Sequence, residues 1–126
     1  MATPIRATAN TLIASIRENR IEEGLDRLYA DEVVSVEPIE GQGGEPRTTF
    51  GQAALREKHA AWFAVVDMHA CRCEGPFFHG EDRFGLIFET KASIKATGAP
   101  NDSREIAIYT VDGDGKITRE EFCEDV

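Results

Sequence analysis

The stretch RFGLIFETKASIKAT, at residues 83–97, decides the fold class. Phe84, Leu86 and Phe88 occupy every second position, and the residues between and after them are mostly small or charged. This alternation predicts a long antiparallel strand with one buried face, because successive side chains of a strand point to opposite sides of the sheet. The buried face needs a covering layer, which the rest of the chain must supply.

The other segments divide into helices in the first half of the chain and strands in the second. The pattern predicts helices over about 4–16, 21–29 and 51–66, a strand over 33–36, a loop over 40–48, strands over 67–74, 104–111 and 116–123, and a break or bend at 75–82. Helices followed by a meander of strands predict an α+β fold. The length of 126 residues predicts a single domain over residues 1–126.

The charge balance limits the partners. The chain has 14 Lys and Arg against 23 Asp and Glu, a net charge of −9, and no basic cluster. Nucleic acid is a polyanion, so we expect no nucleic-acid binding. No apolar run approaches the roughly 20 residues of a membrane span, and the start of the chain does not look like a secretory signal. We therefore expect a cytoplasmic protein without membrane contact.

Two motifs suggest metal binding at first sight. The stretch DGDGKITREEF, at residues 112–122, resembles the second part of an EF-hand calcium loop, but Thr110 stands where the first carboxylate belongs. Asp and Gly at a tight turn favour a hairpin there. Cys71 and Cys73 share one strand face with His69, yet a zinc site needs a fuller ligand set, so buried thiols are expected. We predict no metal and no organic cofactor.

Polar residues at buried-looking positions are the candidates for chemistry. Glu37 closes the strand before Pro38, where it is either a solvated strand end or a general base in a partly dry pocket. His59 and Trp62 share the apolar stripe of the third helix and are either core residues or pocket wall. We expect Glu37, His59 and Trp62 to line one internal cavity. Glu105 is expected opposite Phe122 on the last strand pair.

Four stretches of the chain carry a resemblance to a known family. They are LYADEVVSVEP (28–38), FGQAALREKHAAWF (50–63), EGPFFHG (74–80) and EIAIYTVDGDGKITREEF (105–122). In order and spacing they resemble the SnoaL-like group (polyketide cyclase and ketosteroid isomerase-like) of the nuclear transport factor 2-like superfamily. The resemblance implies a cone-shaped α+β barrel, with three helices packed in a strongly curved, mixed but mainly antiparallel sheet. It also implies a ligand pocket and a homodimer.

The resemblance also assigns site residues. Glu37 stands where the isomerases keep their general base, and His59 stands at a pocket-facing helix position. The Tyr and Asp of the isomerase oxyanion hole fall on Ile13 and Ala107, so that pair is lost. The inward strand positions that could contact a ligand, besides Trp62 on the helix, are Glu105, Tyr109 and Glu120.

Two functions remain open at this point. One is an isomerase, cyclase or dehydratase that abstracts a proton next to a carbonyl, with Glu37 as catalytic base and His59 or Tyr109 as donor to the oxyanion. The other is a non-catalytic ligand-binding or dimerisation module on the same fold. Both imply a small hydrophobic or carbonyl-containing ligand.

Overall fold

The computed structural model describes residues 4–41 and 44–124, and these form three helices and six strands. The elements are α1 (Pro4–Arg17), α2 (Ile21–Leu28), β1 (Tyr29–Val36), β2 (Thr48–Phe50), α3 (Gln52–Val65), β3 (Val66–His79), β4 (Arg83–Ile94), β5 (Ser103–Val111) and β6 (Ile117–Cys123). The predicted α+β class is confirmed. None of the described helices is long and apolar enough to cross a membrane.

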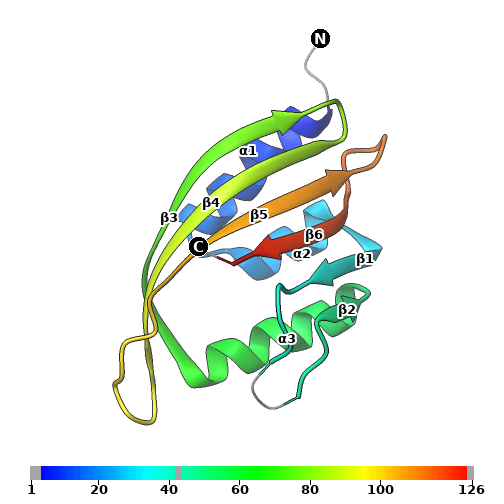
Figure 1. Cartoon of the computed structure of the whole chain (residues 1–126). Helices are drawn as coiled ribbons and strands as arrows, with labels where there is room; N and C mark the ends of the chain where they lie inside the picture. Colours follow the sequence, from blue (N-terminus) through cyan, green and yellow to red (C-terminus); the bar gives the residue numbers. More distant parts are fainter. Residues whose placement is uncertain (1–3, 42–43, 125–126) are drawn as a thin grey trace.

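One curved sheet organises the chain, with strand order β2-β1-β6-β5-β4-β3. All neighbouring pairs are antiparallel except β1 and β6, which run parallel. The sheet is not closed, because β2 and β3 are its two edges. Figure 1 shows α1 and α2 behind the sheet and α3 across its lower end, as in the expected cone.

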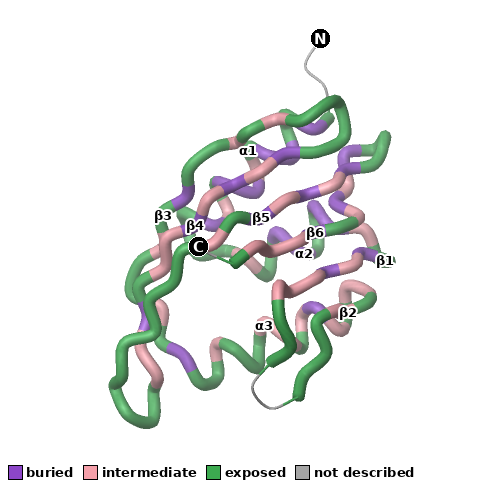
Figure 2. The backbone as a smooth tube through the Cα atoms, in the orientation of Figure 1, coloured by how far each residue is buried: buried purple, intermediate pink, exposed green. Residues whose placement is uncertain are grey.

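The core lies between the helices and the inner face of the sheet, which we define as the face that carries Phe84, Leu86 and Phe88. These three alternate positions of β4 are buried, as the opening stretch predicted. Apolar residues of α1, such as Ala9 and Leu12, belong to the same cluster. Figure 2 shows the buried positions recurring along α1, β4 and β5, whereas α3 is mostly half-buried or exposed.

Two local predictions were wrong. The strand expected over 67–74 continues to His79 through a register irregularity between Glu74 and Phe77, so within 75–82 the chain turns only at residues 80–82. The long strand β4 pairs with β3 on both sides of this irregularity, so regular antiparallel pairing resumes after it. Tyr29 was expected on the second helix but begins β1. The predicted loop over 40–48 holds, although β2 begins at Thr48 and residues 42–43 lie outside the described residues.

The calcium-like stretch forms the turn of the β5–β6 hairpin, as predicted. The Asp112 carboxylate accepts hydrogen bonds from the backbone N–H groups of Asp114 and Lys116, both at 2.9 Å. Glu121 lies on β6, where Arg119 Nε is 2.9 Å from its carboxylate. The Asp112 carboxylate thus caps the turn, and the Glu121 carboxylate pairs with an arginine of its own strand. A calcium titration remains the test of the expected lack of calcium affinity.

Candidate functional site

The end of β1 presents Glu37 to the helical side of the sheet. Val33 and Ser35 are buried, and Glu37 follows the same alternation directly after the strand. Lys58 of α3 forms an ion pair with the Glu37 carboxylate and lies 3.3 Å from Ser35 Oγ. Both side chains of the ion pair remain about one-third exposed. The base candidate is therefore held by a lysine from the facing helix, at an accessible edge of the core.

His59 and Trp62 lie further along α3. Burial and the neighbouring Lys58 charge lower the pKa of His59 to about 4, so its imidazole is neutral at pH 7. Its Nδ1 is buried and has no hydrogen-bond partner among the described residues. Trp62 is 37% exposed and packs edge-on against Phe63, with ring centroids 5.0 Å apart. Leu55 is the one residue of the expected apolar stripe that is fully buried within α3. The C-terminal half of α3 is therefore half-buried or exposed.

Glu120 is the most deeply buried acidic side chain of the site. It lies on β6 opposite Tyr109 and beside Ser35, and only 2% of its surface is exposed. Burial raises the pKa of Glu120 to about 7, although Lys58 and a hydrogen bond from Tyr29 act in the opposite direction. The Tyr29 hydroxyl also hydrogen-bonds to Tyr109, and burial raises the pKa of both phenols well above 10.

Glu105 is half-buried on β5, opposite Phe88. Burial and the Glu37 charge raise the pKa of its carboxyl. The expected pairing of Glu105 with Phe122 was wrong by two residues. Val111 pairs with Ile117 and not with Lys116, and the irregularity between Thr110 and Val111 adds a second shift, which places Ala107 opposite Phe122. Glu105 nonetheless points to the inner face of the sheet, since it alternates with buried Ala107 and Tyr109.

These side chains form one group, which we call the inner polar cluster. Its members are Tyr29, Glu37, Lys58, His59, Glu105, Tyr109 and Glu120. The charges of Glu37 and Lys58 act on His59, Glu105 and Glu120 alike. The fold thus brings His59 close to the four acidic and tyrosine candidates of the strands. It adds Tyr29 and Lys58, which the sequence analysis did not single out.

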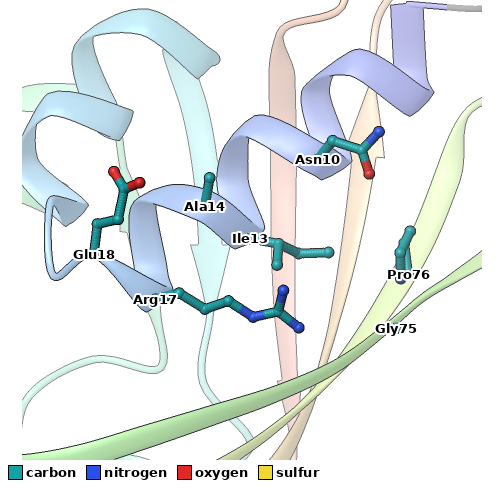
Figure 3. A pocket seen from close by; sticks show the side chains of 7 residues that line it. All are labelled: Asn10, Ile13, Ala14, Arg17, Glu18, Gly75 and Pro76. Atoms are coloured by element: carbon teal, nitrogen blue, oxygen red, sulfur yellow. The ribbon is translucent and has the colours of Figure 1, made fainter.

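The shared cavity expected for Glu37, His59 and Trp62 stays a prediction. A groove of about 330 Å³ lies elsewhere, between α1 and β3, lined by Asn10, Arg17 and Pro76 among others. Figure 3 shows Asn10 and Arg17 extending from α1 toward Pro76 at the edge of the sheet. The groove reaches the core only through Ile13.

Cys71 and Cys73 lie on the same inner side but offer no separate site. Cys73 is buried opposite Phe88, and Cys71 Sγ is 3.7 Å from Thr90 Oγ1. Burial raises the pKa of both thiols, so neither is an activated nucleophile. Over the ranges that the structure describes, no three His, Cys, Asp or Glu side chains gather into a group that could hold a metal ion.

Comparison with known proteins identifies the family. The SnoaL-like domain model matches residues 6–123. The chain belongs to the SnoaL-like family. No curated protein matches it.

Solved structures agree with this SnoaL-like assignment. A Mesorhizobium loti protein assigned as a SnoaL-like polyketide cyclase is 31% identical, with coverage of 98% of this chain and 99% of that one and a TM-score of 0.84. TerC, co-crystallised with polyporic acid, is 25% identical over 98% and 92% of the two chains, with a TM-score of 0.71. Δ5-3-ketosteroid isomerase from Mycobacterium sp. is 21% identical over 98% and 92%, with a TM-score of 0.72, a likeness of fold.

The two positions to which the sequence resemblance assigned the oxyanion donors of the isomerases are both buried. Ile13 and Ala107 are 7% and 0% exposed and belong to the apolar core. On the same inner face, Tyr109 of β5 lies opposite Glu120 of β6.

Proposed function

We propose that this SnoaL-like protein binds a small carbonyl-containing molecule on the inner face of its sheet and removes a proton from the carbon next to the carbonyl. The observation that carries the proposal is the Glu37 carboxylate, held by Lys58 at a half-open edge of the core. TerC, a structural relative, was crystallised with an organic acid, and another relative is a ketosteroid isomerase, which supports a small organic ligand.

The chemistry follows from the charges. Glu37 takes the proton, the C–H electron pair moves into an enolate, and the enolate oxygen needs a hydrogen-bond donor. His59 is neutral at pH 7 because the pKa of its imidazole is about 4, so it binds ligand without adding a charge. Return of the proton to another carbon gives isomerisation, attack of the enolate on a second carbonyl gives cyclisation, and loss of a β-hydroxyl gives dehydration.

Hydrogen–deuterium exchange tests the proton abstraction. Wild-type protein in D₂O should exchange the protons next to the carbonyl of 2-tetralone faster than buffer alone, as followed by proton NMR. A general base typically contributes about 10²–10⁴-fold, so Glu37→Gln should lose most of the acceleration.

Glu32→Gln is the matched control for this substitution. Glu32 lies on β1, the strand that Glu37 follows, but is exposed, so its variant should exchange the ketone at the wild-type rate. A Glu37→Gln protein that exchanges as fast as wild type would refute Glu37 as the base.

The second candidate function is a non-catalytic ligand-binding module. The apolar residues at Ile13 and Ala107 favour it, because they remove donors that stabilise an enolate in the isomerases. Trp62 is the only tryptophan, so its fluorescence reports ligand near α3. Saturable quenching by 2-tetralone without enhanced exchange would support the module over the enzyme.

A further inference from the structure

Lys58 is the only positively charged side chain of the inner polar cluster at pH 7, because the one histidine of the cluster is neutral. The cluster also contains three carboxyl groups, at Glu37, Glu105 and Glu120. They come from three places in the sheet, which are the end of β1, β5 and β6. One ammonium cannot neutralise three carboxylates, so the charge state of the cluster depends on which carboxyl group the ammonium pairs with.

The contacts of Lys58 show that its partner is Glu37. Lys58 Nζ forms an ion pair with the Glu37 carboxylate and lies 3.3 Å from Ser35 Oγ. It also lies 5.7 Å from the centre of the Phe122 ring, within range of a cation–π contact. Ser35 belongs to β1 and Phe122 to β6, the two strands that pair in parallel. The ammonium is therefore held between α3 and these two strands and is paired with a single carboxylate.

The Lys58 charge acts on Glu105 and Glu120 only at longer range. Among the residues that the structure describes, neither carboxyl group forms an ion pair with Lys58. Burial raises the pKa of both groups, and the Glu37 charge adds to this rise, whereas the Lys58 charge opposes it. Repulsion between carboxylates is mutual, so ionised Glu105 and Glu120 in turn favour a proton on Glu37. Lys58 is the member of the cluster whose charge offsets that repulsion.

The other titratable members of the cluster are uncharged at pH 7. His59 is neutral because its pKa is about 4. Burial raises the pKa of the Tyr29 and Tyr109 phenols well above 10, so both stay protonated. Outside the cluster, Arg47 Nε donates to the backbone carbonyl oxygen of Glu37 at 3.1 Å, in an exposed position, and not to the carboxylate. Within the described ranges, the α3 ammonium is thus the one cation paired with this carboxylate.

We propose that Lys58 is the positioning residue that keeps Glu37, rather than Glu105 or Glu120, in the ionised form. The inference rests on the proposed function and adds the residue that makes Glu37 a base. An ionised carboxylate can accept a carbon-bound proton, whereas a protonated one cannot. Lys58 touches no reacting atom: the proton moves to Glu37 and back, and the three N–H bonds of the ammonium stay intact.

Carboxyl ¹³C NMR measures the charge of these groups without any ligand. Protein that carries ¹³C-labelled glutamate is titrated from pH 5 to 8, and Glu37→Gln identifies the Glu37 resonance by its loss. In wild type at pH 6, this resonance should report a carboxylate. In Lys58→Met, the pH at which the resonance is half-way to its acid position should rise by about one unit, because the ammonium no longer stabilises the charge. Lys58→Gln is a second neutral variant, which serves if Lys58→Met does not fold.

Exchange of 2-tetralone in D₂O measures the consequence for the base. The acidic limb of the kcat profile of Lys58→Met should move upward by the same amount as the Glu37 resonance. This corresponds to a loss of up to about tenfold at the acidic end of the range. The loss should vanish toward pH 8, where Glu37 ionises without help, and KM should stay within about twofold of wild type. A purely structural role of Lys58 would instead lower the rate equally at every pH.

Two further variants separate charge from packing. Lys58→Arg keeps the positive charge, so it should restore the wild-type resonance and exchange profile within about threefold. Arg56→Met is the matched control, since Arg56 lies on the same helix with a side chain 33% exposed, against 30% for Lys58. Its partner is Asp26 of α2, outside the cluster. Arg56→Met therefore removes the same charge from α3 but should leave the Glu37 resonance and the exchange rate unchanged.

The outcomes separate this inference from the proposed function. A Glu37 resonance that titrates alike in wild type and in the neutral Lys58 variants would overturn the role of Lys58, whether or not the protein is an enzyme. Faster exchange in Lys58→Met would also overturn it, because the ion pair would then block the base. An acidic limb that stays in place despite a shifted resonance has the same consequence. If the resonance shifts but wild type does not exchange 2-tetralone, the charge assignment stands and the proposed function falls.

Discussion

Burial acts on two residues of the inner polar cluster in opposite directions. The pKa of Glu120 rises from 4.5 to about 7, so the folded protein holds this proton more tightly and stability falls as pH rises from 4.5 to 7. The pKa of His59 falls from 6.5 to about 4, so stability rises as pH rises from 4 to 6.5. The two contributions to the free energy of unfolding offset each other between pH 4.5 and 6.5.

Substituting either residue should reveal the pH-dependent contribution that the other makes to the free energy of unfolding. Relative to wild type, Glu120→Gln should gain stability with increasing pH between 4.5 and 7, by up to about 1.4 kcal/mol per pH unit. His59→Gln should lose stability relative to wild type as pH rises from 4 to 6.5. Urea unfolding followed by circular dichroism at a series of pH values measures both differences. Differences that do not change with pH would contradict the assigned burial of these two groups.

Sequence reasoning at the residue scale succeeded where a local rule applied. Strand alternation placed Glu37 on the face of Val33 and Ser35, and the family resemblance placed Tyr109 and Glu120 inward; in the structure Tyr109 and Glu120 are buried and Glu37 is half-buried. Lys58 lies off the apolar stripe of α3, and its partner lies on another element, so no local pattern pointed to it. The proton affinity of Glu120 likewise depends on contacts from three other elements.

At the scale of elements, the β5–β6 turn is fixed to the first helix. Gly115 has φ of 84°, and a Cβ there would lie 3.1 Å from Thr8 Oγ1. The Thr8 hydroxyl is also 2.5 Å from the Gly115 carbonyl oxygen, to which it donates. The turn therefore needs glycine at this position both for its backbone angle and for the close approach of α1.

Alanine substitution at the two turn glycines should separate the requirement for glycine at residue 115, which comes from its backbone angle and the nearby α1, from a general effect of turn flexibility. Gly115→Ala should destabilise the protein by about 1–3 kcal/mol, because it strains the backbone and crowds Thr8. Gly113→Ala is the control, since a Cβ there meets nothing within 4 Å. Thermal unfolding measures both. Equal melting temperatures for the two variants would show that α1 does not depend on this turn.

The predicted helices and strands were accurate where the hydrophobic periodicity agreed with the residues that usually begin or end such elements. The start of α3 near residue 51 and the alternation of β4 were confirmed. The continuation of β3 past Gly75 and Pro76 could not be predicted, because a glycine–proline pair usually ends a strand and only pairing with β4 carries this one on. The short β2 depends in the same way on its partner β1.

At the scale of the whole molecule, the outer face of the sheet carries an apolar patch. Cross-strand register brings Phe77, Ile87, Ile106, Ile108 and Cys123 together on the side away from the helices. Phe77 and Ile106 are 54% and 41% exposed. An exposed apolar patch on a sheet face is typical of a protein interface. This arrangement supports the homodimer that the sequence resemblance implied.

Light scattering should return a particle of twice the 13.9 kDa chain mass at micromolar concentration. Ile106→Glu should shift it to the monomer, because it places a charge inside the patch. Ile39→Glu is the matched control, since Ile39 is 60% exposed but lies outside the patch. A wild-type protein that remains a monomer across this range would refute the dimer.

The family resemblance predicted the cone and its curved sheet, but not how the sheet is joined. The parallel pairing of β1 with β6 lies beyond any local pattern, since the whole β3–β5 meander separates the two strands in sequence. This pairing also sets an order for synthesis. A ribosome makes α1, α2 and β1 long before β6, so the first strand waits with one edge unpaired while the meander is built. Folding is therefore expected to finish only after translation has passed residue 123, and a nascent chain stalled before residue 117 should stay protease-sensitive throughout its first half.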